Sequence, residues 1–403
     1  MRVLGILLVE MCLGAVIVLP NPRRMPTRQR IMNVAGHEVI AKYPSRLGDP
    51  LAQSCFSPKA LVALPNESYL IGCGGGFALF NRPTETFSKL EVSDDLPDVS
   101  YALYRSGDGI IWQGGMEASR MRLDGRAVSV VPHGNTNRLD KLNYVFSGLA
   151  GTVWFGGPSG LFLYDNGVVT GPLLPGSSIE SSYEALPDPW PPTIHGNSRD
   201  GRVATVAPSK PETGLAFLKA MRESVSGATD SNGIVWLGAF RALLRFDPRS
   251  NEWSVYPRPY VGDRPSICHT DRDGSVWLAS YLGLVQAFNT ATKSWRSLDV
   301  PAHIQFPPMR SPFSVPHPAG EPPAPLLPEF RLRGMLEDSQ HQIMFATSMG
   351  LVIYDGRGDR WSVYTPTNSP LPSDIVNSLL QAAPNEIWVV TGEGIVILRD
   401  SPK

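Results

Sequence analysis

Residues 232–256 read NGIVWLGAFRALLRFDPRSNEWSVY, and this stretch decides the fold. Its opening Asn-Gly pair tolerates the positive φ angles that two-residue hairpin turns require. Three apolar runs follow: one contains Trp236, one ends in Asp247 and one begins with Trp253. Short apolar runs separated by turn residues predict antiparallel strands joined by hairpins. With a further strand expected before the turn, the unit contains four strands.

The unit recurs along most of the chain. Aligned on Trp236, eight segments have spacings of 42, 42, 50, 32, 41, 67 and 44 residues, with the anchors Leu70, Trp112, Trp154, Ala204, Trp236, Trp277, Met344 and Trp388. The spacings of 50 and 32 residues average 41, and the spacing of 67 residues includes a Pro-rich insertion of about 25 residues. Four short strands in a period near 42 are typical of a β-propeller blade. The tryptophans then fill the wedges between neighbouring sheets.

The sequence therefore predicts an all-β propeller of four-stranded blades whose ring is closed by an N-terminal strand. The last unit stops at Asp400 after its third strand, and the segment from Ile40 to Pro44 resembles the fourth-strand segment from Trp253 to Pro257. A strand donated from the N-terminus removes an exposed sheet edge. Eight anchors favour eight blades. Seven is the alternative, if the weak unit at Ala204 is only an elaborated loop.

Composition and charge exclude several classes of function. The 36 basic and 37 acidic residues give a net charge of -1 without a long basic run, so we expect no nucleic-acid partner. The 38 glycines and 38 prolines favour many short elements over a helical bundle. The seven histidines show no paired metal spacing, and the cysteines at 12, 55, 73 and 268 suggest neither a zinc site nor a disulfide framework. We expect no metal and no cofactor.

The N-terminus carries a separate signal. Residues 3–19 are apolar apart from Glu10, follow Arg2 and precede an arginine-containing stretch. We interpret residues 1–25 as a signal peptide or membrane anchor, with a misassigned start or a buried strand as the alternative. Residues 26–403 then form a single propeller domain with Pro-rich insertions at 171–196 and 301–328. Any contact with a membrane is expected only through the N-terminal segment.

The repeat resembles the two-component regulator propeller repeats. It shows Asp-Gly or Asn-Gly, then Val-Trp-Leu, then Leu-x-x-Phe-Asp, then Trp-Ser-x-Tyr, most clearly over residues 232–256, 273–295 and 342–364. The resemblance covers most of residues 60–400. It implies a ligand-sensing propeller outside the cytoplasm (periplasmic, secreted or anchored facing outside), often tied to carbohydrate use. Since only three residues follow Asp400, we expect signalling to pass through another protein.

Candidate ligand-binding residues come from loops, because specificity in a propeller resides in its loops. The first insertion contains Trp190 and His195, and the second contains His303. Trp190 is either an exposed ring on which a ligand stacks or a ring packed onto the edge of a blade. Arg241 and Tyr281 lie between expected second and third strands. Arg241 occupies a position where sister units have Gly or other small residues. Its guanidinium points either toward a central pocket or into solvent.

Three functions compete on these observations. The leading hypothesis is a non-catalytic, sensor-like recognition propeller for a small ligand, a glycan or a protein partner. A propeller lyase or hydrolase with a site in the axial pocket is the second, and a structural scaffold for protein interactions is the third. The sequence leans against an enzyme, because no catalytic residue can be assigned from its motifs.

Overall fold

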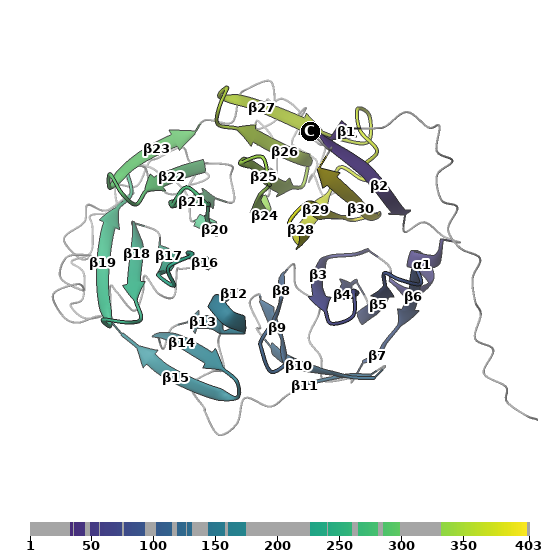
Figure 1. The fold of residues 1–403 in the computed structure, drawn as a ribbon, viewed down its shortest axis with the longest axis horizontal. Helices are drawn as coiled ribbons and strands as arrows, with labels where there is room; N and C mark the ends of the chain where they lie inside the picture. Colours follow the sequence, from purple (N-terminus) through teal and green to yellow (C-terminus); the bar gives the residue numbers. More distant parts are fainter. Residues whose placement is uncertain are drawn as a thin grey trace, which may run out of the picture.

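A computed structural model arranges the chain as small antiparallel sheets around a central axis (Figure 1). The structure describes residues 33–34, 36–44, 49–55, 57–74, 76–92, 102–114, 119–125, 127–130, 144–157, 160–174, 226–239, 241–259, 265–280, 285–298 and 332–400. Helix is confined there to α1 (Pro50–Ser54) and the 3-10 turn η1 (Leu149–Gly151). No helix in these ranges is long and apolar enough to cross a membrane.

Seven sheets form the ring, and we number them as blades along the chain. Each of the first three contains four strands in chain order, and blade 2 gains β7 (Glu91–Val92) beside its last strand. Their bounds are β3 (Ala60–Leu64), β4 (Ser68–Cys73), β5 (Gly76–Asn81) and β6 (Thr86–Lys89) in blade 1; β8 (Ala102–Arg105), β9 (Ile111–Gly114), β10 (Ser119–Asp124) and β11 (Ala127–Val130) in blade 2; and β12 (Tyr144–Ser147), β13 (Val153–Gly157), β14 (Gly160–Asp165) and β15 (Val168–Leu173) in blade 3.

The other four blades follow the same order, except that two N-terminal strands complete blade 7. Their bounds are β16 (Ser226–Thr229), β17 (Val235–Gly238), β18 (Ala242–Asp247) and β19 (Glu252–Pro257) in blade 4; β20 (Pro265–Thr270), β21 (Ser275–Ser280), β22 (Val285–Asn289) and β23 (Ser294–Leu298) in blade 5; β24 (Leu332–Glu337), β25 (Gln342–Thr347), β26 (Gly350–Asp355) and β27 (Arg360–Tyr364) in blade 6; and β28 (Val376–Ala383), β29 (Glu386–Thr391), β30 (Gly394–Asp400), β2 (His37–Pro44) and β1 (Asn33–Val34) in blade 7.

The prediction of eight blades is wrong, and the seven-blade alternative is confirmed. The innermost strands contact one another in sequence around the ring, from β3 through to β28 and back to β3. Because β12 packs directly on β16, no sheet lies between blades 3 and 4, where an eighth blade was expected. The Phe146 ring occupies the space beside Gly227, 2.4 Å from where a Cβ would stand. The weak anchor Ala204 lies outside the described residues.

The anchor tryptophans fill the wedges between blades, as the repeat predicts. Trp112 and Trp388 are fully buried on the second strands of blades 2 and 7, and the anchors at 154, 236 and 277 are nearly so. Each belongs to an apolar cluster that spans two neighbouring blades. The sheets therefore bury their faces against one another, which an isolated blade cannot do.

An acid six residues before the anchor is a part of the repeat that the sequence analysis overlooks. In blade 5, Asp271 Oδ2 accepts a hydrogen bond from the indole of Trp277 at 2.7 Å, and its Oδ1 accepts one from the Ser275 amide at 2.7 Å. In blade 4, Asp230 repeats the contact with Trp236 at 3.1 Å. One carboxylate thus closes the hairpin and satisfies the buried ring nitrogen.

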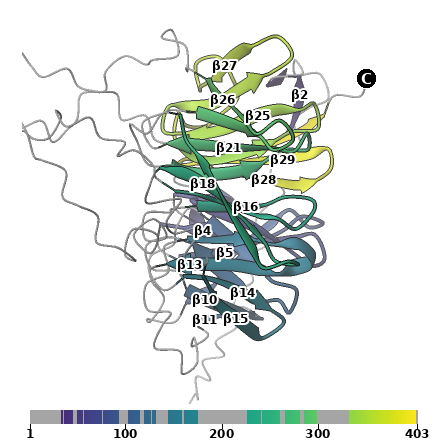
Figure 2. The same cartoon turned by 90° about the vertical axis from the view of Figure 1, so that its left-hand side faces the viewer.

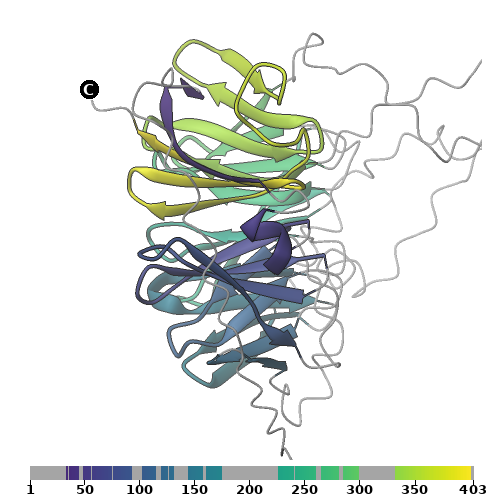
Figure 3. The ribbon, with the colours of Figure 1, turned by 90° about the vertical axis from the view of Figure 1, so that its right-hand side faces the viewer.

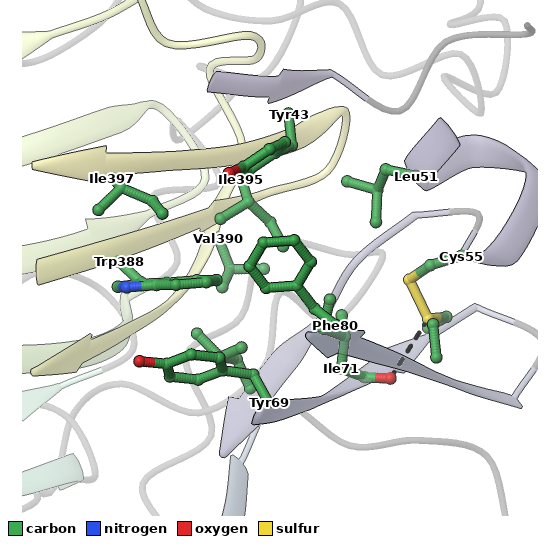
Figure 4. Close-up of a cluster of buried hydrophobic side chains, with 13 residues drawn as sticks. Tyr43, Leu51, Cys55, Tyr69, Ile71, Phe80, Trp388, Val390, Ile395 and Ile397 are labelled. Atoms are coloured by element: carbon green, nitrogen blue, oxygen red, sulfur yellow. Dashed lines mark hydrogen bonds between the residues drawn. A yellow bond between two sulfur atoms is a disulfide. The ribbon is translucent and has the colours of Figure 1, made fainter. Parts of the chain in front are cut away.

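The ring closes as predicted, between strands from opposite ends of the chain. Strand β2 pairs with β30 from His37 opposite Asp400 to Pro44 opposite Gly394, and the two lie side by side in Figures 1 and 3. Tyr43 on β2 then joins the apolar cluster between blades 7 and 1 (Figure 4), where its ring lies 5.1 Å from that of Phe80. The N-terminal strand therefore supplies both backbone pairing and core.

A disulfide between Cys55 and Cys73 corrects the sequence analysis, in which the cysteine spacing suggested no such bond. Cys55 ends α1 and Cys73 ends β4, and packing of the α1 segment beside blade 1 brings their Cα atoms to 5.4 Å. This distance lies within the range of native disulfides. Cys268 is a free, buried thiol whose pKa is raised by desolvation.

Acid is expected to destabilise the fold through His269 on β20. Burial lowers the pKa of His269 to about 4, from 6.5 in an exposed chain. The unfolded state therefore takes up a proton near pH 6.5, so stability is complete above that pH and falls as the pH drops toward 4. Between pH 7.5 and 4.5 this group is expected to remove about 2 to 3 kcal/mol of stability.

Urea unfolding at the two pH values measures the effect, and His269→Leu serves as the comparison because it has no proton to gain. Carboxylates contribute to the acid sensitivity of both proteins equally. We expect the loss of stability to be smaller in the variant by about 2 to 3 kcal/mol. Equal losses in both proteins would show that His269 is protonated as readily in the folded state as in the unfolded one.

Candidate functional site

The two faces of the ring differ in what they carry. We call "upper" the face formed by the turns between second and third strands and by the linkers between blades, and "lower" the opposite face. Figure 2 shows the ring from the side, with strands running between the faces. The linkers from β15 to β16 and from β23 to β24 contain most of the two Pro-rich insertions, so both insertions join the ring at the upper face.

Of the predicted ligand-binding residues, only Arg241 belongs to the described part of the chain. Trp190, His195, Tyr281 and His303 lie outside it. Arg241 is half-buried in the upper-face turn between β17 and β18, and its carbonyl accepts a hydrogen bond from the Arg258 amide at 2.9 Å. Arg241 thus lies between a second and a third strand, and its role in ligand binding stays a prediction.

Arg258 is an upper-face residue that the sequence analysis missed. It follows β19, is 6% exposed, and its Nε donates to Gln286 Oε1 at 2.9 Å. A second guanidinium nitrogen lies 3.5 Å from the Ala239 carbonyl, and Gln286 on β22 is fully buried. The side chain thus links blades 4 and 5 and holds a permanent positive charge beside Arg241. The only sequence signal was an arginine directly after a fourth strand.

A third arginine lies at the inner rim of the same face. Arg333, at the start of β24, donates to Asn377 Oδ1 on β28. The buried Asn377 in turn donates through Nδ2 to the Pro58 carbonyl at 2.6 Å. This chain of hydrogen bonds joins blades 6, 7 and 1, so the rim is tied across three blades. Because hydrogen bonds already hold these side chains in place, binding a ligand at the rim would order few further groups and would cost little conformational entropy.

Buried polar side chains concentrate toward the upper face. In the described part of the chain they lie mainly at upper strand ends, namely Gln113, Ser119, Arg258, Ser280, Gln286, Thr347, Ser348, Asn377 and Thr391. Buried polar groups need hydrogen-bond partners and are found where a site is built. Guanidinium, amide and hydroxyl groups suit an oxygen-rich ligand. No cluster of three metal-ligating side chains occurs among the residues described.

The fold is shared with proteins of different function. No family model matches the sequence, and no curated protein matches it. Similar solved structures include a streptogramin B lyase (TM-score 0.54, 11% identity, covering 90% of this chain and 97% of that one). They also include the WD40 propeller domain of Doa1 (TM-score 0.54, 10% identity, covering 91% of this chain and 98% of that one). A third is the extracellular domain of a hybrid two-component system from B. thetaiotaomicron (TM-score 0.54, 16% identity, covering 90% of this chain and 43% of that one).

The match to the two-component system covers less than half of that protein's chain. Identities of 10–16% show a common fold, and function has to be argued from the site. The comparisons therefore show that this chain is a β-propeller like the extracellular domains of two-component systems and like streptogramin B lyase.

Proposed function

We propose that the chain is an exported, non-catalytic recognition propeller of the two-component regulator type. Three observations support export: the Cys55–Cys73 disulfide, the apolar segment within residues 1–25, and the similarity to extracellular sensor domains. Disulfides persist mainly in oxidising compartments. Residues 26–403 would then face the periplasm or the outside, and signalling would pass through a separate protein.

The upper face carries the proposed binding function. The supporting observation is that three arginines, Arg241, Arg258 and Arg333, lie on this face; Arg258 is buried and Arg333 is hydrogen-bonded to buried Asn377. Guanidinium groups recognise carboxylates and phosphates, and they hydrogen-bond to hydroxyls. The proposed ligand is a small oxygen-rich molecule or a glycan, with a protein partner as the alternative. Trp190, His195, Tyr281 and His303 are proposed to complete the site.

Arg241→Ala is expected to weaken ligand binding by about ten- to a hundredfold, since a charged hydrogen bond contributes about 1.5–3 kcal/mol. The ligand is first found by a thermal-shift screen of residues 26–403 against neutral and acidic oligosaccharides. Binding to the folded state raises the melting temperature. Arg249→Ala is the matched control, because Arg249 lies in a lower-face turn of the same blade. Equal affinity in both variants would remove the upper face as the site.

A lyase is a second candidate, favoured by the similarity to streptogramin B lyase, which this chain matches along 97% of that structure. An elimination cleaves a bond without adding water, so the fragment masses sum to the substrate mass, whereas hydrolysis adds one water. Mass spectrometry of any ligand found in the screen separates the two reactions from simple binding. Recovery of the intact ligand after long incubation supports recognition without catalysis.

A further inference from the structure

A cleft opens on the lower face, between blades 5 and 6. Its volume is about 490 Å³, within the range of small-molecule pockets. Its walls come from the β20–β21 and β24–β25 turns near the axis, and from β23 and the β26–β27 turn at the outside of the ring. It is thus separated from the upper-face arginines by the length of the strands.

His341 in the cleft departs from the repeat. Four sister turns have glycine at this position, Gly109, Gly151, Gly233 and Gly274, with φ between 79° and 87°, whereas blade 1 has Glu67 there with φ 51°. His341 adopts a φ of 62°, a left-handed conformation that glycine takes without strain and that costs other residues of order 1 kcal/mol. At this position His341 places an imidazole, where most sister turns have no side chain, on the wall of the cleft.

Glu337 holds that imidazole in one orientation. Its carboxylate is only 5% exposed, its Oε1 lies 2.8 Å from His341 Nδ1, and its Oε2 accepts the Arg272 amide of blade 5 at 2.7 Å. The Nδ1 proton of a neutral imidazole then points to Glu337, which leaves Nε2 as a hydrogen-bond acceptor. The His341 side chain is 42% exposed, so Nε2 can reach a ligand.

The charges of the cleft are separated between its two sides. On the inner side, the exposed carboxylate of Asp273 joins the acceptor nitrogen of His341. On the outer side lie the guanidinium groups of Arg357, which is exposed, and of Arg296. Arg296 is positioned by Asp359 at 3.0 Å and by the hydroxyl of Tyr354. A ligand that fits both sides carries a positive group at one end and a negative group at the other.

We propose that this cleft binds a small zwitterion, an amino acid or a dipeptide. Its ammonium group donates to Asp273 and to His341 Nε2, and its carboxylate accepts from Arg357 and Arg296. Ile343 and Trp277 supply the apolar part of the wall. The site is independent of the upper-face ligand, so the molecule has two recognition faces.

Calorimetric titration with glycyl-leucine at pH 7.5 tests the proposal on residues 26–403. We expect binding, and an affinity at least about tenfold lower for N-acetylglycyl-leucine and for glycyl-leucinamide, each of which lacks one charged end. His341→Gly is expected to weaken binding by a similar factor. Glycine relieves the left-handed backbone but removes the partner of the buried Glu337 carboxylate, so the melting temperature of the variant is measured before the titration. Arg241→Ala on the upper face is expected to have no effect.

Absence of heat at millimolar glycyl-leucine overturns the proposal, and so does equal binding of the two blocked peptides. Undiminished binding by His341→Gly overturns it as well. Should that variant misfold, Arg357→Ala decides the question, since an exposed turn arginine can be removed without loss of core packing. A fold-preserving Arg357→Ala with unchanged affinity would mean that the peptide binds elsewhere.

Discussion

His37→Ala is expected to destabilise the propeller by about 3 kcal/mol, because it leaves a buried carboxylate without its hydrogen-bond partner. His37 is fully buried at the start of the closing strand β2. Its Nε2 lies 2.9 Å from Asp338 Oδ2 in blade 6, and its Nδ1 lies 2.8 Å from Asp400 Oδ1 at the end of β30. Among the described residues, removal of the imidazole leaves the fully buried Asp338 carboxylate with the backbone amides of residues 340 and 342, both of which donate to Oδ1.

The position of His37 makes the loss cooperative. Val34 and Tyr43, on either side of it, are buried in the clusters on the two faces of blade 7, so loosening β2 exposes core as well as the edge of β30. Urea denaturation measures the change in unfolding free energy. Glu38→Ala is the matched control, because Glu38 is the next residue of β2 and is only half-buried. Similar midpoints for the two variants would show that closure does not rest on the histidine.

The blades and their closure could be predicted because both are local or periodic signals. Turn residues and apolar runs repeat within each unit, and the strand around Tyr43 carries the fourth-strand pattern without a third strand before it. The number of blades could not be predicted, because two irregular spacings around Ala204 averaged to one period. Only the contact of β12 with β16, between residues some 80 positions apart, decides it.

The candidate sites could be predicted less well, because they form between blades. Arg241 was found from its departure from small sister residues. Arg258 was missed since its partner, Gln286, belongs to the next blade. His341 could have been found by the same reasoning as Arg241, because it replaces a glycine of the repeat. The separation of Cys55 and Cys73 by 18 positions similarly gave no spacing to recognise, because their approach depends on where α1 packs.

The double variant Cys55→Ser/Cys73→Ser is expected to lose about 3 kcal/mol of stability, because an 18-residue separation closes a loop that restricts the unfolded chain. Reduction of the native protein is expected to produce the same loss, so the two proteins unfold alike in dithiothreitol. Both sulfurs are buried in the cluster between blades 7 and 1 (Figure 4), which also contains Tyr69, Phe80 and Trp388. The bond therefore strengthens the blade that meets the closing strand.

Thiol counting under denaturing conditions decides whether the bond exists in the isolated protein. For residues 26–403, we expect one reactive thiol, that of Cys268, before reduction and two more, those of Cys55 and Cys73, after it. Cys268→Ala is the control: it removes the single reactive thiol but leaves the response of the melting temperature to reductant unchanged. Three thiols before reduction, in protein prepared from an oxidising compartment, would contradict both the cross-link and the support that it gives to export.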